Sequence, residues 1–193
     1  PVVYINNDEY ETTSNLYSLS LAGEYLEADD TLIIESDILY ESAVVDRILE
    51  SDEECLTFVS RPKPWMDGSI VTLDKDGYIN DFIGADNFAF QDMDSYYKTV
   101  SMYKLSKNYL NKVYLPLLAA YVQAWGNKTH YESALKVVAF KEQRVLKALV
   151  LENEKWYEIN DIQDIDIAES IFAEGDEKLT RYMRRFGGYW RYE

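Results

Sequence analysis

Residues 31–37 place a short strand directly before an acidic turn, and this pairing constrains the fold more than any other stretch. The run Thr31-Leu-Ile-Ile has strand character, the turn Glu35-Ser-Asp37 follows, and a helical pattern covers about residues 42–50. In an α/β sheet, ligands and metals lie at the ends of strands. We therefore expect Asp37 to lie at such an end, where a carboxylate is well placed to hold a cation.

Strand and helix patterns alternate along the first part of the chain, then a hairpin appears, and helices follow. The segment Asp74-Lys-Asp-Gly77 has the turn chemistry of that hairpin, with glycine at the position that favours positive φ. This order predicts an α/β fold with a mixed sheet flanked by helices. Residues 84–95 have no period and are expected to form a surface loop. The predicted strands are residues 2–5, 31–35, 55–59, 69–73, 78–83, 98–105, 145–151 and 156–159, and the predicted helices are about 16–26, 42–50, 106–125, 129–140, 161–173 and 174–186.

Composition limits the classes of partner. With 35 acids against 19 bases, the net charge is -16, which argues against nucleic acid because a phosphate backbone requires a basic surface. No apolar run reaches the roughly 20 residues that a membrane span needs, so no membrane contact is expected. Cys55 is the single cysteine and lies in a buried-strand pattern. One cysteine and no export signal favour the cytoplasm.

Two acidic turns are candidate metal sites. Asp37 follows one strand and Glu158-Ile-Asn-Asp161 follows another, so the two turns can converge at one edge of a sheet and supply oxygen ligands to one Mg²⁺. The alternatives are structural. Asp37 could cap the helix that follows it, and the acids around Asp161 could complement a helix dipole.

Aromatic and charged residues are candidates for substrate contacts. Trp65 and Tyr131 are suited to wall a bound ammonium, because a cation over an aromatic face gains ~0.5–2 kcal/mol. Asp67 and Glu132 would be the charge partners of that ammonium. Lys98, near a predicted strand start, could reach a phosphate as a point charge. Core packing of the two rings and solvation of the lysine are the alternatives.

Five segments stand in a specific order along the chain. They are Tyr10-Glu-Thr-Thr-Ser-Asn-Leu-Tyr-Ser-Leu19, Ile33-Ile-Glu-Ser-Asp37, Lys63-Pro-Trp-Met-Asp-Gly-Ser-Ile-Val-Thr-Leu73, Tyr97-Lys-Thr-Val-Ser-Met-Tyr-Lys104 and Lys155-Trp-Tyr-Glu-Ile-Asn-Asp-Ile-Gln-Asp164. Together they resemble the small-headgroup cytidylyltransferases. These are the phosphocholine cytidylyltransferase-like and 2-aminoethylphosphonate cytidylyltransferase enzymes of the nucleotide-diphospho-sugar transferase fold, which is Rossmann-like. The resemblance covers about residues 1–175.

The resemblance implies a reaction and residues that carry it. CMP would pass from CTP to a small amine-bearing phosphonate or phosphate, such as 2-aminoethylphosphonate or phosphocholine, and pyrophosphate would leave, with Mg²⁺ as cofactor. Asp37 and Lys98 would be the catalytic residues. The metal ligands would be Asp37, Asn160 and Asp161, with Asn160 standing where many relatives have an aspartate. The substrate-binding residues would be Trp65, Asp67, Tyr131, Glu132 and Asn15.

The two ends of the chain depart from the family pattern. Relatives begin with a strand and a Gly-rich loop that grips the nucleotide, whereas Pro1 corresponds to a point well inside that domain. We therefore expect residues 1–175 to be the C-terminal part of a nucleotidyltransferase domain, truncated and inactive as it stands. Residues 176–193 would form a helix and a junction that resembles those leading into a fused aminotransferase domain.

Two alternative functions stay open at the level of sequence. A glycosyltransferase of the same fold would use an Asp-x-Asp metal motif, and Glu35-Ser-Asp37 stands at that place instead. A non-catalytic binding module is the second alternative, because the nucleotide-gripping loop is missing.

Overall fold

The structure is a computed structural model of the chain, and it describes residues 2–63, 66, 68–142 and 144–173. The chain divides into two compact units. The larger unit contains residues 1–34 and 51–151, and the smaller unit contains residues 35–50 and 152–193. The acidic turn that follows the strand Thr31–Ile34 therefore belongs to the smaller unit.

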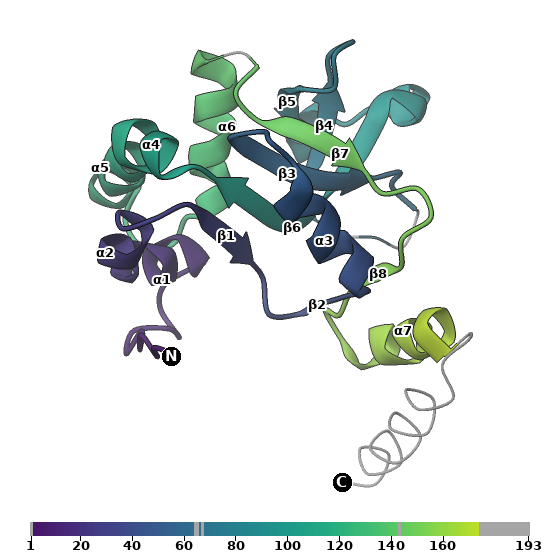
Figure 1. Ribbon diagram of the computed structural model, residues 1–193, viewed down its shortest axis with the longest axis horizontal. Coiled ribbons are helices and arrows are strands. Elements are labelled where there is room, and N and C mark those ends of the chain that lie inside the picture. Colours follow the sequence, from purple (N-terminus) through teal and green to yellow (C-terminus); the bar gives the residue numbers. More distant parts are fainter. Residues whose placement is uncertain (1, 64–65, 67, 143, 174–193) are drawn as a thin grey trace, which may run out of the picture. The chain divides into compact units, whose positions relative to one another are not determined.

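A six-stranded mixed sheet forms the framework of the larger unit (Figure 1). The strands follow the order β5-β4-β6-β3-β7, and β1 pairs with β6 as well. The β3–β7 pair is parallel, whereas β6 is antiparallel to β1, β3 and β4. This is the mixed sheet that the sequence predicts. Its strands are β1 (Thr31–Ile34), β3 (Cys55–Ser60), β4 (Ile70–Leu73), β5 (Ile79–Ile83), β6 (Tyr96–Leu105) and β7 (Lys147–Val150).

Strand β6 connects most of this sheet. On one edge it pairs with β3, and on the other edge it pairs first with β4, through residues 96–98, and then with β1, through residues 102–105. Its register with β3 shifts between these two halves. Ser101 lies at the shift with a φ of 53°, a conformation that non-glycine residues rarely adopt. The resulting bulge lets one strand serve two neighbours along the same edge.

Helices pack on this sheet through one buried apolar cluster, to which side chains from helices and strands both contribute. Each large apolar side chain that leaves water contributes about 1.5–3 kcal/mol. Among the described helices, none has the length and apolar character needed to cross a membrane. The helical elements of this unit are α1 (Asn15–Leu21), α2 (Gly23–Leu26), η1 (Ala85–Asn87), η2 (Phe90–Ser95), α4 (Lys107–Tyr109), the π-helical turn η3 (Leu110–Tyr114), α5 (Leu115–Trp125) and α6 (Tyr131–Lys141).

The smaller unit is built on a short antiparallel pair of strands, β2 and β8. Glu41 fastens the end of this pair in two ways. Its N–H donates to the carbonyl of Lys155 at 3.0 Å, and its carboxylate accepts the N–H of Lys155 at 3.1 Å. Arg47 adds an ion pair with Glu154. The elements of this unit are β2 (Ile38–Tyr40), α3 (Ser42–Glu50), β8 (Trp156–Glu158) and α7 (Ile162–Ala173).

The structure confirms most predicted elements with small shifts at their ends, and it corrects two predictions. Residues 2–5 form no strand, and their side chains are exposed. An apolar run becomes a strand only where a sheet edge takes up its backbone hydrogen bonds. Residues 84–95 lie at the surface as predicted, but they contain the short helices η1 and η2. The predicted helix 174–186 lies outside the described residues.

Gly77 allows a test of the hairpin between β4 and β5, where its φ is 80°. An alanine Cβ there would find its nearest neighbours at 3.7 Å, so space is sufficient. The left-handed backbone nevertheless costs an alanine about 1–2 kcal/mol. Gly77→Ala should therefore lower the free energy of unfolding in urea by about 1 kcal/mol.

Gly23→Ala is the matched control. Gly23 begins α2, has no positive φ, and a Cβ there would have no neighbour within 4 Å. This variant should leave stability unchanged or raise it slightly. Equal losses in the two variants would show that the backbone conformation of Gly77 is not the cause.

Candidate functional site

The two acidic turns singled out from the sequence are neighbours in the smaller unit. Asp37 directly precedes β2, and its carbonyl accepts the N–H of Ile159 at 2.8 Å. The next residue, Ile38, pairs with Glu158 across the two strands. The side chain of Asp37 is exposed. Pairing of β2 with β8 therefore brings the Asp37 turn to the turn that leads into α7.

Asp161 and Asp164 cap the start of α7. Asp161 Oδ1 accepts the N–H of Gln163 at 2.7 Å, and Asp164 Oδ2 accepts the N–H groups of Asn160 at 2.8 Å and of Asp161 at 3.0 Å. Such reciprocal bonds satisfy backbone donors that a helix start leaves open. The N–H of Asn160 is the main reason that the pKa of Asp164 lies below its usual range. Asp161 thus caps α7, a structural role at the helix start where the sequence left dipole complementation open as the alternative to a metal ligand.

The oxygen donors around these turns suit a hard cation. Asp37 and Asp161 offer carboxylate oxygens, Asn160 offers an amide oxygen, and all three side chains are exposed. Mg²⁺ binds such oxygens and usually keeps several waters or substrate phosphates, so it needs few protein ligands. Within the described ranges, no group of three or more His, Cys, Asp or Glu residues could hold a metal ion. A cation at these turns would therefore depend on oxygens from water or substrate.

The larger unit contains a second anionic centre, the carboxylate of Glu132. Three hydroxyl groups surround it. Tyr103 donates to Oε1 at 2.7 Å, Ser69 donates to Oε2 at 2.5 Å, and the hydroxyl of Thr99 lies 3.4 Å from Oε1. Burial, together with the nearby Glu132 charge, raises the pKa of Tyr103 well above its usual value. Tyr103 is therefore a stable neutral donor to this carboxylate. Glu132 itself is half-buried.

Tyr131 and Asn15 hold the start of α6, the helix that carries Glu132. The side-chain oxygen of Asn15 accepts the N–H of Tyr131 at 3.0 Å. The preceding residue, Ser14, donates its N–H to the carbonyl of Asn127 at 2.7 Å. The Tyr131 ring is 3% exposed and lies edge-on to Tyr103, with 5.8 Å between the ring centroids. In this structure Asn15 positions α6, and Tyr131 packs in the core.

Lys98 is buried, with 2% of its surface exposed, so the solvated alternative for this lysine is wrong. It pairs with Ser60 on β3 and with Ile70 on β4, and its ammonium donates to the carbonyl of Thr99 at 3.2 Å. Successive side chains of a strand point to opposite faces. Lys98 therefore projects from the face of β6 opposite to Thr99 and Glu132.

Two predicted site residues cannot be placed, and three residues of the Glu132 site were not predicted. Trp65 and Asp67 lie outside the described residues. Sequence reasoning missed Ser69, Thr99 and Tyr103, whose hydroxyls surround Glu132. The sequence contains little sign of this role, because all three residues lie in or next to predicted strands. Only their convergence on one carboxylate distinguishes them from other strand residues.

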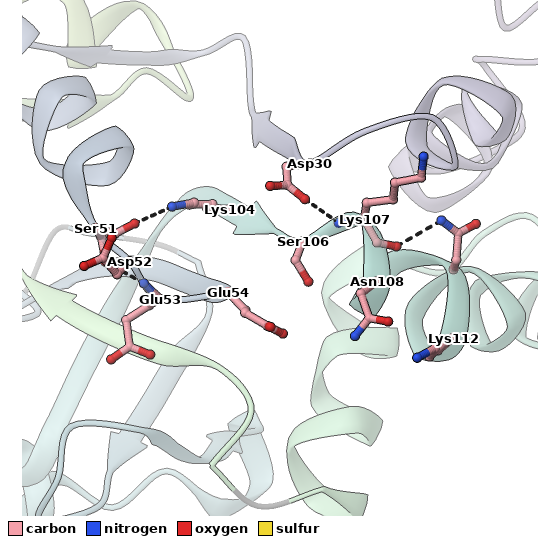
Figure 2. Close-up of a pocket in the computed structure, with 11 residues that line it drawn as sticks. Asp30, Ser51, Asp52, Glu53, Glu54, Lys104, Ser106, Lys107, Asn108 and Lys112 are labelled. Carbon is pink, nitrogen blue, oxygen red and sulfur yellow. Dashed lines mark hydrogen bonds between the residues drawn. The ribbon is translucent and has the colours of Figure 1, made fainter.

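A cavity of about 710 Å³ lies elsewhere in the larger unit (Figure 2). Some of its polar groups bond to one another. Lys104 donates to the carbonyl of Ser51 at 2.5 Å, and the N–H of Lys107 donates to Asp30 at 2.8 Å. None of the predicted site residues is among those that line it, so it is not the predicted site. The lining residues are Asp30, Ser51, Asp52, Glu53, Glu54, Lys104, Ser106, Lys107, Asn108, Asn111 and Lys112.

Comparison with known proteins finds similarity to enzymes that handle CTP or CMP. A CMP-5'-(3-aminopropyl)phosphonate synthase of Streptomyces rubellomurinus is 28% identical over 190 residues, which cover 98% of this chain and 30% of that protein. The CTP:phosphocholine cytidylyltransferase from Streptococcus pneumoniae matches with a TM-score of 0.65 and 19% identity, over 86% of this chain and 66% of that one. The inositol-1-phosphate CTP transferase from T. maritima matches with a TM-score of 0.62 and 18% identity, over 88% of this chain and 66% of that one. A scan against models of protein families finds no match.

These similarities confirm the resemblance and the fold that the sequence predicts. The solved structures have the nucleotide-diphospho-sugar transferase fold, and at 18% and 19% identity they establish the fold alone. The chain spans 30% of the length of the curated relative and 66% of each of the two solved chains.

The hydroxyl shell of Glu132 can be tested through Tyr103. Tyr103→Phe removes a short hydrogen bond from a fully buried tyrosine to a half-buried carboxylate, and bonds to charged groups contribute about 1.5–3 kcal/mol. Urea unfolding should show a loss of this size. Tyr114→Phe is the matched control, because the Tyr114 hydroxyl is equally buried but reaches only a neutral carbonyl, that of Tyr131, at 3.4 Å. It should cost about 0.5 kcal/mol, and equal losses would contradict the special role of the carboxylate.

Proposed function

We propose that this chain is part of a cytidylyltransferase, which transfers CMP from CTP to a small amine-bearing phosphonate and releases pyrophosphate. The observation that carries the proposal is the match of 98% of the chain to a CMP-5'-(3-aminopropyl)phosphonate synthase. Two solved neighbours described as a CTP transferase and a CTP:phosphocholine cytidylyltransferase support the same reaction class. The ordered motifs of the sequence point in the same direction.

Glu132 favours an acceptor with a protonated primary amine. A carboxylate has about four lone-pair positions, and the three surrounding hydroxyls leave at least one of them for a ligand. A primary ammonium donates hydrogen bonds to that position, whereas a quaternary ammonium such as choline has no N–H to donate. Charge-assisted bonds of this kind are about twice as strong as neutral ones. We therefore rank an aminoalkylphosphonate above phosphocholine as the acceptor.

The nucleotide phosphates belong, in this proposal, with the Asp37 turn. Asp37 and Asn160 would hold a Mg²⁺ ion, with Asp161 beside them, and the bound ion would neutralise phosphate charge. A chain with a net charge of -16 needs such local compensation to bind CTP. Lys98, a buried point charge, is a candidate for a contact to a phosphate oxygen of the nucleotide, but it lies on the face of β6 opposite to Glu132 and so not beside an acceptor held there.

The chemical step is an in-line displacement. A phosphonate oxygen of the acceptor forms a bond to the α-phosphorus of CTP, and the bond from that phosphorus to the bridging oxygen of the β-phosphate breaks. The electron pair leaves with pyrophosphate. In such reactions protein side chains position the reactants and balance charge rather than form covalent bonds. Within the larger unit, Glu132 would bind the acceptor through its amine.

Asp37→Ala tests the metal assignment. In the full-length protein, the variant should lower Mg²⁺-dependent pyrophosphate release from CTP about 10²-fold or more, because charge stabilisation by a metal contributes several kcal/mol. Asp46→Ala is the matched control, since Asp46 is an exposed acid on α3, and it should keep normal turnover. Near-normal turnover of Asp37→Ala with Mg²⁺ would contradict the role of Asp37.

Glu132→Gln tests the acceptor assignment. The substitution preserves shape and removes the charge, so the KM for 3-aminopropylphosphonate should rise about 10- to 100-fold, as expected for a charge-assisted bond. The KM for CTP should not change. Propylphosphonate, which lacks the amine, serves as the substrate control and should react equally with both proteins. An equal loss with both acceptors would show that Glu132 does not bind the amine.

The same assay separates the alternative functions. A glycosyltransferase would release a nucleoside diphosphate from a nucleotide sugar and no pyrophosphate from CTP. A binding module would bind its ligand without turnover. The absence of pyrophosphate release with every phosphonate or phosphate acceptor tested would overturn the proposed function.

A further inference from the structure

Charge is distributed unevenly along this chain. The chain contains 35 aspartate and glutamate residues, but the segment from Ser95 to Tyr131 contains none. That segment forms β6, α4, η3 and α5, all in the larger unit. The larger unit therefore presents a helical surface without acids in a chain whose net charge is -16. The lysines of the segment are Lys98, Lys104, Lys107, Lys112 and Lys128.

Helix α5 presents an uncharged side to solvent. It contains no charged residue, and Leu118 is its buried residue. Trp125, at its end, is 67% exposed and lies against Tyr121, with 4.7 Å between the ring centroids. Surface helices normally carry charged residues on the outer side, whereas the centre of a protein interface lacks charge and is rich in aromatic residues. The exposed residues of α5 are Pro116, Ala119, Ala120, Gln123, Ala124 and Trp125.

Acidic residues border this surface on the side of α2. Asn111 donates its side-chain N–H to the carbonyl of Glu27 at 3.1 Å. Lys107 donates its N–H to Asp30 at 2.8 Å (Figure 2). The segment 27–30 therefore lies against α4 and η3. The exposed acids of this segment, Glu27, Asp29 and Asp30, thus adjoin the exposed lysines Lys107 and Lys112.

We propose that this surface, formed by α5 with α4, η3 and α2, binds a second copy of the chain in a symmetric dimer. In a two-fold symmetric interface, both copies use the same surface, related by a rotation of half a turn. The lysines of one copy can therefore face the acids of the other. The uncharged side of α5 lies at the centre of that contact. This part of the surface offers no charge to repel a second acidic copy.

Charge also decides against other occupants. A nucleic acid or an anionic membrane would be attracted by the lysines of α4 and η3, but it would be repelled by the acids of residues 27–30 beside them. A second copy is complementary to both groups. We therefore infer a second copy as the occupant, because acidic and basic residues lie side by side on the same surface.

The test is the mass of the full-length protein in solution, measured by light scattering during gel filtration over a range of micromolar concentrations. We expect a dimer. Ala120→Glu introduces an acid in the middle of the exposed side of α5 and should raise the dimer dissociation constant at least tenfold. Ala43→Glu is the matched control, because Ala43 is also an exposed helical alanine but lies on α3, and it should leave the mass unchanged.

Circular dichroism of both variants shows whether the fold is retained. A protein that is monomeric throughout the concentration range would overturn the proposal. A dimer that survives in Ala120→Glu, or that is lost equally in Ala43→Glu, would also overturn it. So would a monomer that binds phosphatidylglycerol vesicles with a blue shift of tryptophan fluorescence that Ala120→Glu abolishes, because the surface would then serve a membrane.

Discussion

Strand β6 is the constraint on which the larger unit depends. Buried backbone groups need hydrogen-bond partners, and β6 finds them in β3 on one edge and in β4 and then β1 on the other. The register of β6 with β3 shifts between Thr99 and Tyr103, and Ser101 lies at this shift with a φ of 53°. Thr99 precedes the bulge and Tyr103 follows it, yet both reach Glu132. The irregularity that completes the sheet therefore also gathers the hydroxyl groups around the carboxylate.

Glu132 shows how the fold keeps a half-buried charge. A carboxylate removed from water loses solvation, and only hydrogen bonds or an opposite charge restore it. The hydroxyls of Ser69 and Tyr103 provide short bonds without neutralising the charge, so the site keeps its attraction for a cation. Asn15 contributes at a distance, because its bond to the N–H of Tyr131 fixes where α6 begins. The anionic centre is thus a property of the sheet, α1 and α6 together.

The sequence predicted features that depend on neighbouring residues. The Gly77 hairpin, the strand before Asp37 and the helix after Asp161 are each encoded within about ten residues, and the structure contains all three. The order of motifs predicted the fold that the solved neighbours share. Residues 2–5 were mistaken for a strand because their apolar character is local, whereas a strand also needs a partner. The sequence predicted that the Asp37 turn and residues 158–161 converge at the edge of a sheet. It did not predict that β2 and β8 pair directly.

The sequence by itself determined the types of element, the uneven distribution of charge and the two acidic turns, because these follow from nearest neighbours and composition. Tertiary structure alone decided which polar side chains are buried and what they bind. Lys98 is enclosed because β3 and β4 flank its strand, and Glu132 is surrounded because Ser69 and Tyr103, 63 and 29 residues away in sequence, fold against it. Contacts over such separations leave no periodic signal in the sequence. They arise only when the sheet register and the start of α6 are both fixed.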